Sequence, residues 1–203
     1  GLPDGATLSA GTDLGNGVWE VPADSVEGLT LSPPADFSGE LTLTVTATST
    51  EGNGDSATTT ASITVSVAGV ADAPVLNVTD SAGVEDTAIA LDIDAALTDT
   101  DGSEVLSVTV AGLPDGASLS AGTDNGDGSW TLAPADLAGL TIIPPANFAG
   151  EIVLTVAATS REVGEGTAVT TTALTVSVAA AADAPALVVA DAAGAEDSAI
   201  ALD

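Results

Sequence analysis

Apolar and polar residues alternate with a period of two along most of the chain. The clearest run is 89–94, where Ile, Leu and Ile alternate with Ala, Asp and Asp. Such alternation places successive side chains on opposite faces of a strand and buries one face. The pattern predicts strands at 74–78, 89–94, 106–110, 130–132, 140–143, 152–157 and 174–178, with a hairpin turn at 124–128.

These strands are short and are separated by turn signals about every 8 to 12 residues, with no helical stretch. Such a series predicts an all-β fold. Specifically, we expect an antiparallel Greek-key sandwich of seven strands.

The chain repeats itself. Residues 1–13 return almost unchanged as 112–124, an offset of 111 residues, and this register holds without a gap to the end of the sequence. A period of this size predicts a tandem array of domains, each with its own core. We expect the last two-thirds of a first β-sandwich repeat at 1–72, a complete repeat at 73–183 and the start of a third at 184–203. We therefore treat the sequence as part of something longer, with strands missing from its first and third repeats.

Composition narrows the function. Of the 203 residues 45% are hydrophobic, enough for a core, and 30 acidic residues face one cation, Arg161. The net charge of −29 cannot be neutralised internally, so nucleic acid and anionic membranes are poor partners. No apolar run approaches about 18 residues, so we expect no membrane insertion. Without His, Cys, Tyr or Lys we expect no enzyme and no zinc or thiolate site.

Acidic residues gather in polar turns where one repeat meets the next. With alternating strands, the turns at 99–104 and 161–167 fall at the same end as the linker residue Asp72. The turn at 81–86 and the corner at 148–151 fall at the other end, beside Asp183. Two carboxylates about 4 Å apart repel by roughly 1 kcal/mol in water and roughly 4 kcal/mol at an effective dielectric of about 20. Hard oxygen ligands favour Ca²⁺, so we expect a calcium site on Asp72, Asp99, Asp101 and Glu104, the alternative being solvated turns.

Four motifs carry a family resemblance: Val84-Glu85-Asp86, the 99–104 turn, the corner at 145–150, and the strand at 175–178 that leads into Ala182-Asp183-Ala184-Pro185. Together they resemble the cadherin-like and immunoglobulin-like repeats of giant bacterial surface adhesins of the type I secreted, biofilm-associated RTX class. The resemblance implies calcium ligands at the following residues: Glu85 with Asp86, Asp99 with Asp101, Glu151, the linker residues Asp72 and Asp183, and the third-repeat copies Glu196 and Asp197.

Two departures from that family change the expected site. The linker has a single Asp where cadherins have several acids, so we expect fewer than the three ions usual there. Ser160 replaces an expected acid, which leaves Glu162 as a shifted candidate.

The resemblance implies a calcium-rigidified extender repeat of a large extracellular adhesin, which holds adhesive ends away from the cell surface. Its partners would be calcium ions and neighbouring repeats. One alternative is a structural subunit of an extracellular filament or surface layer, assembled from identical chains by strand exchange. Another is a ligand-binding module.

Overall fold

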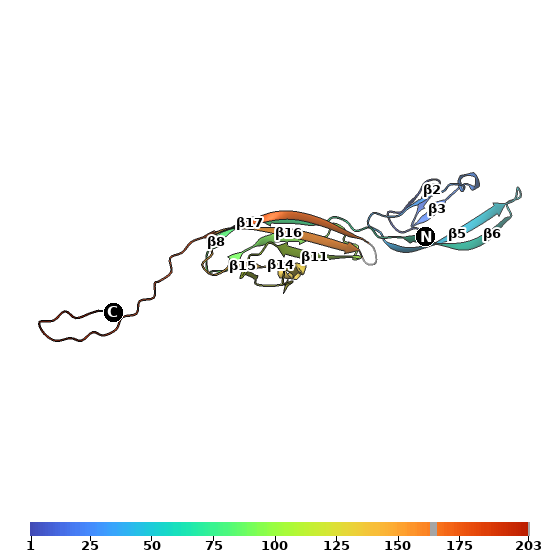
Figure 1. Ribbon diagram of the computed structural model, residues 1–203. Helices are drawn as coiled ribbons and strands as arrows, with labels where there is room; N and C mark the ends of the chain where they lie inside the picture. The colour runs from blue at the N-terminus through green and yellow to red at the C-terminus, as the bar shows by residue number, and fades with distance from the viewer. Residues whose placement is uncertain (163–165, 203) are drawn as a thin grey trace.

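The structure is a computed structural model that describes residues 1–162 and 166–202. The first and second repeats follow one another end to end, and the segment after residue 179 extends beyond them (Figure 1). Nearly all regular structure is strand, so the all-β prediction is confirmed. No helix in the described ranges is long and apolar enough to cross a membrane.

The strands of the first repeat are β1 Thr7–Leu8, β2 Thr12–Gly15, β3 Val18–Glu20, β4 Leu31–Ser32, β5 Gly39–Thr50 and β6 Ser56–Val67. Those of the second are β7 Val75–Thr79, β8 Ser81–Val84, β9 Ile89–Ala90, β10 Asp92–Ala96, β11 Glu104–Ala111, β12 Ser118–Leu119, β13 Thr123–Asp124, β14 Ser129–Leu132, β15 Thr141–Ile143, β16 Gly150–Glu162 and β17 Thr167–Ala179. Each repeat also has one 3-10 turn, η1 Ala23–Ser25 and η2 Pro134–Asp136, which the sequence pattern did not predict.

In the second repeat one sheet has the order β13-β14-β11-β16-β17-β8. The remaining strands form a three-stranded sheet, β12-β15-β9, and a pair, β10-β7. Buried side chains from both groups of strands make one core, as expected of a β-sandwich. Its members come from 89–178, and Val108, Leu154 and Leu174 are fully buried.

The expected strand at 89–94 is divided. Ile89, Leu91 and Ile93 are buried as their alternation predicts, but the strand breaks at Leu91, whose N–H donates to Leu140 O at 2.9 Å. Before the break β9 pairs with β15, and after it β10 pairs with β7. The chain thus changes its strand-pairing partner at Leu91, while buried and exposed side chains continue to alternate through the break.

The expected turn at 81–86 was wrong over its first four residues. Residues 81–84 form β8, which lies parallel to β17, and the turn is confined to Glu85 and Asp86. Gly83 leaves room for the next strand, because a Cβ on it would lie 2.5 Å from Ile89 Cγ1 in β9. The pattern Ser-Ala-Gly-Val carries too little hydrophobicity to indicate a strand.

The first repeat contains the long hairpin β5–β6 and shorter pairs, but little buried apolar surface. Residues 180–202 form no strand. The predicted turn at 161–167 includes residues 163–165, which lie outside the described part.

Candidate cation site between the repeats

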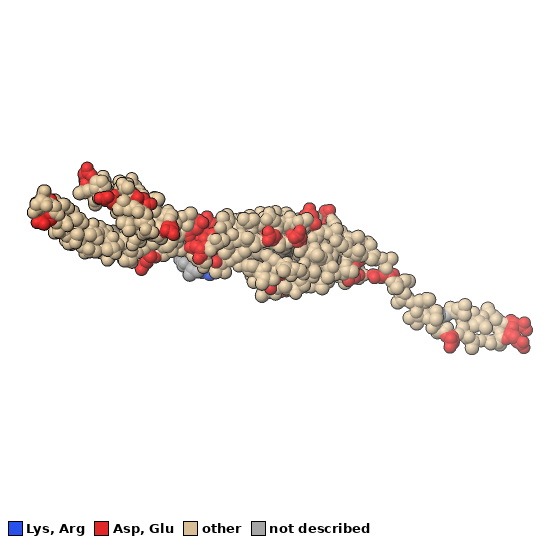
Figure 2. Space-filling view, turned by 180° about the vertical axis from the view of Figure 1, so that it is seen from behind, with Lys and Arg blue, Asp and Glu red and all other residues tan. Residues whose placement is uncertain are grey.

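A cleft of about 280 Å³ lies between the first and second repeats. Acidic side chains form a belt at this junction (Figure 2). Asp36 comes from the first repeat, Asp72 from the linker, and Asp99, Ser103 and Glu162 from the second repeat. Four carboxylates from three segments therefore face one space.

The 99–104 turn is organised by its own carboxylates. Asp99 is buried and accepts a hydrogen bond from the Asp101 N–H at 2.7 Å. The Ser103 hydroxyl and N–H both donate to Asp101 Oδ1, and these bonds hold the pKa of Asp101 below its usual 3.8. Hydrogen bonding to the ionised form keeps this exposed carboxylate negative.

The buried carboxylate of Glu104 is only partly hydrogen-bonded. It is only 7% exposed, and its Oε1 accepts from the Asp72 N–H at 2.7 Å and the Ser160 hydroxyl at 3.0 Å. Its Oε2 is buried and has no hydrogen-bond partner in the described structure. A buried carboxylate oxygen without a partner is costly, and a cation would remove that cost.

A second glutamate lies directly opposite. In the β11–β16 register Glu104 pairs with Glu162, which is 3% exposed and accepts from the Ser103 hydroxyl at 3.0 Å. Like charges opposite each other on paired strands are destabilising, the more so away from water. A cation close to these two buried carboxylates would therefore stabilise the folded state.

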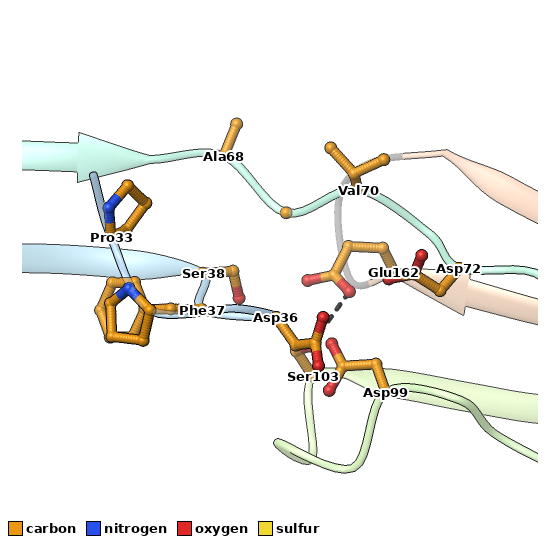
Figure 3. A pocket seen from close by; sticks show the side chains of 12 residues that line it. Pro33, Asp36, Phe37, Ser38, Ala68, Val70, Asp72, Asp99, Ser103 and Glu162 are labelled. Carbon is orange, nitrogen blue, oxygen red and sulfur yellow. Dashed lines mark hydrogen bonds between the residues drawn. The ribbon is translucent and has the colours of Figure 1, made fainter. Parts of the chain in front are cut away.

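Glu162 also contacts the linker. A Cβ on Gly69 would lie 2.5 Å from Glu162 Cδ and 2.6 Å from its Cγ, so this glycine leaves the room that the carboxylate occupies. Figure 3 shows Asp36, Asp99 and Glu162 pointing into the cleft, with the bond from Ser103 to Glu162 dashed.

The opposite end of the second repeat carries the remaining candidates. Glu85 is buried, and its Oε1 accepts from the Ala181 N–H of the outgoing linker at 2.7 Å. Asp86, with φ of 60°, accepts from the Asn147 N–H at 3.0 Å. The structure thus places Glu85 and Asp86 beside the outgoing linker, as the alternation of strands predicted.

Four other candidate calcium ligands are exposed to solvent. Glu151 at the start of β16, Asp183, Glu196 and Asp197 are all exposed. Asp197 nevertheless repeats the backbone of Asp86, since both have φ of 60°. The third-repeat turn therefore keeps the local shape of its complete counterpart.

Among the described residues no group of three or more acidic side chains is gathered closely enough to hold a metal ion.

The candidate ligands supply the oxygen donors that a hard divalent cation prefers, but their carboxylates are not gathered around one point in this structure. Glu104 Oε2 is the buried acceptor without a hydrogen-bond partner at the first joint.

Sequence reasoning missed Asp36. The corner acid was assigned to Glu151, three positions beyond Phe148, whereas the side chain that lines the cleft comes from one position before the equivalent Phe37. In the second repeat the same position is Asn147, so comparison of the copies gave no shared acid.

No protein-family model matches the chain, and no curated protein matches it.

Proposed function

We propose that the chain is a calcium-rigidified extender segment of a large extracellular bacterial adhesin. In this proposal its repeats are seven-stranded, Greek-key, cadherin-like sandwiches joined end to end. They hold an adhesive end of the protein away from the cell surface.

One observation carries the proposal: Glu104 and Glu162 face each other in a nearly buried pair at the joint, with one oxygen unpartnered. A buried pair of like charges is a poor way to stabilise a fold. It becomes favourable when a doubly charged ion lies between or beside the carboxylates.

The position of the acids gives the ion a mechanical role. Asp72 lies in the linker, Glu104 accepts from the Asp72 N–H, and Asp99 lines the same cleft. An ion bound to linker and domain together removes the freedom of the linker to bend. Without it the excess negative charge drives the repeats apart.

Extracellular calcium modules bind with dissociation constants of about 10⁻⁴ to 10⁻³ M. Millimolar calcium outside a cell would fill such joints, and a calcium-poor cytoplasm would leave them empty. A chain that is pliable before export and stiff afterwards suits a long surface protein.

Small-angle scattering of the 203-residue chain, with calcium and with a chelator, tests this function. We expect the joint between 1–72 and 73–183 to stiffen with calcium, so that the distribution of interatomic distances narrows around an extended form. Sodium chloride of equal ionic strength is the control, because it screens charge without bridging ligands. An identical distance distribution in calcium and in chelator would remove the mechanism.

A second candidate is a filament or surface-layer subunit completed by strand exchange. The observation that favours it is the β5–β6 hairpin, where Val45 and Ile63 are exposed, together with 184–202, which forms no strand although its counterpart contains β7 and β8. Light scattering distinguishes the two: strand exchange gives polymers whose size grows with concentration, and the extender gives monomers.

A further inference from the structure

Three Asn-Gly pairs lie in exposed hairpin turns: Asn16-Gly17 between β2 and β3, Asn53-Gly54 between β5 and β6, and Asn125-Gly126 between β13 and β14. This dipeptide is prone to spontaneous deamidation, because glycine has no side chain to hinder attack by its backbone nitrogen on the preceding Asn side chain. In a folded protein both groups must be free to move toward each other. The hydrogen bonds of each pair therefore decide how fast it reacts.

The pair at Asn125 is held on both sides of the bond that would form. The Asn125 side-chain amide donates to Ser129 Oγ at 3.0 Å and to Thr131 Oγ1 at 3.1 Å. The Gly126 N–H donates to Asp124 Oδ1 at 2.8 Å. The side chain that would be attacked and the nitrogen that would attack are thus both fixed in other contacts.

The pair at Asn53 is held in a similar way. The Asn53 side-chain amide donates to Asp55 Oδ2 at 2.9 Å, and its side-chain oxygen accepts from the Asp55 N–H at 3.0 Å. The Gly54 N–H donates to Glu51 O at 2.9 Å. These bonds must break before the Asn53 side chain can turn toward the Gly54 nitrogen, and breaking them slows the reaction.

The pair at Asn16 lacks both restraints. It forms a two-residue loop between the paired residues Gly15 and Val18, and its φ values of 54° and 69° are those of a type I′ turn. Within the described structure no hydrogen bond reaches the Asn16 side chain or the Gly17 N–H. Asn16 is exposed, so water has access to this turn.

We propose that Asn16 is a site of spontaneous deamidation in the folded protein, and that it reacts ahead of Asn53 and Asn125. The Gly17 nitrogen bonds to Asn16 Cγ, the Cγ–Nδ2 bond breaks, and the Gly17 proton leaves with Nδ2 as ammonia. Water then opens the succinimide ring to aspartate or isoaspartate. Each event adds one negative charge to the β2–β3 hairpin.

The two products have different effects on the turn. Asp36 and Asp86 have φ of 59° and 60°, so aspartate fits the left-handed backbone of Asn16. Isoaspartate routes the main chain through the side chain and lengthens it by one methylene, which changes the geometry of a two-residue loop. We therefore expect isoaspartate to weaken the pairing of Gly15 with Val18.

Ageing of the whole chain at mildly alkaline pH, followed by mass spectrometry, tests the assignment. Cleavage after glutamates places the three Asn-Gly pairs on separate peptides. We expect the Asn16 peptide to gain the mass of deamidation about tenfold faster than the other two, the effect of one or two hydrogen bonds. Ageing in guanidinium chloride is the control, because unfolding removes those bonds and should bring the three rates together.

The double variant Ser129→Ala with Thr131→Ala frees the Asn125 side chain, and it should raise the rate at Asn125 without changing the rate at Asn16. An unchanged rate at Asn125 would contradict the protective role of these bonds. Equal rates at the three pairs of the folded chain would overturn the inference. A lead of Asn16 that persists in guanidinium chloride would overturn it as well, because the flanking sequence would then be the cause.

Discussion

The β5–β6 hairpin of the first repeat and the β16–β17 hairpin of the second have nearly the same pattern but different surroundings. Val45 is 54% exposed and its counterpart Val156 is fully buried, and Ile63 is 50% exposed where Leu174 is fully buried. In the second repeat β11 pairs along β16 and β8 along β17. The first hairpin has neither partner, so alternation selects the apolar face and the neighbouring strands decide whether it is buried.

The largest effect we expect from this difference is on folding itself. Residues 73–183 contain the whole buried cluster, so this segment alone should unfold in one cooperative transition in urea. Residues 1–72 alone should show none, because a two-stranded hairpin is at best marginally stable in water. Circular dichroism during urea titration measures both, and a cooperative transition in 1–72 would contradict this reading of the comparison.

The same Leu→Ala substitution in each hairpin should show the difference in burial through its effect on the free energy of unfolding. Leu154 is fully buried on β16, and its counterpart Leu43 on β5 is partly exposed. We expect Leu154→Ala to lower the free energy of unfolding by about 2–5 kcal/mol, through lost burial and a residual cavity. Leu43→Ala should change it by less than about 0.5 kcal/mol.

Urea midpoints of the full chain measure both changes. Equal shifts in the two variants would mean that the hairpins have similar surroundings in solution.

The same comparison shows what sequence could predict. The internal repeat and the alternation of apolar and polar residues predicted the strands around Leu154 and Leu174. The alternating direction of successive strands placed Asp72 and Asp99 at the same end of the domain. Both predictions rest on periodic patterns that can be seen in the sequence of each repeat. β8 was missed because Ser-Ala-Gly-Val carries little hydrophobicity and its partner β17 lies about 95 residues away in the sequence. Asp36 was missed because the cleft that it lines is formed together with the neighbouring repeat, and because its counterpart, Asn147, has no charge.

Substitutions in the two linkers should have effects of intermediate size. Gly69→Ala would place a Cβ 2.5 Å from Glu162 Cδ, so the glutamate must move away from the linker. We expect calcium affinity at the first joint to fall several-fold, since the displaced carboxylate no longer faces the ion. Ala180→Gly, the reverse change at the second linker, should leave the first joint unaltered.

NMR titration of the Ser103 amide measures the first joint in both linker variants. A wild-type response in Gly69→Ala would show that Glu162 is free to adopt another position without cost to binding.

The smallest expected effect concerns the hairpin turn before β14. The Ser129 hydroxyl and N–H donate to Asp127 Oδ1 at 2.6 Å and 3.1 Å, and they lower the pKa of Asp127 from its ordinary value of 3.8. In the first repeat Asn16 and Val18 occupy these positions, so this pair is absent there. A lowered pKa in the folded state means that the stabilisation is present above the unfolded-state pKa and is lost as pH falls through the folded value.

Ser129→Ala removes the hydroxyl, the larger cause of the shift, and leaves the backbone N–H as a donor. The pKa of Asp127 should therefore rise part of the way to 3.8, as measured by the pH dependence of its carboxyl carbon in NMR. Thr131→Ala is the control, because that hydroxyl bonds to Asn125 instead of Asp127. If Ser129→Ala left the titration where it was, the backbone N–H would be the donor that sets the charge of this turn, and the difference between the two hairpins would lie in Asp127 alone.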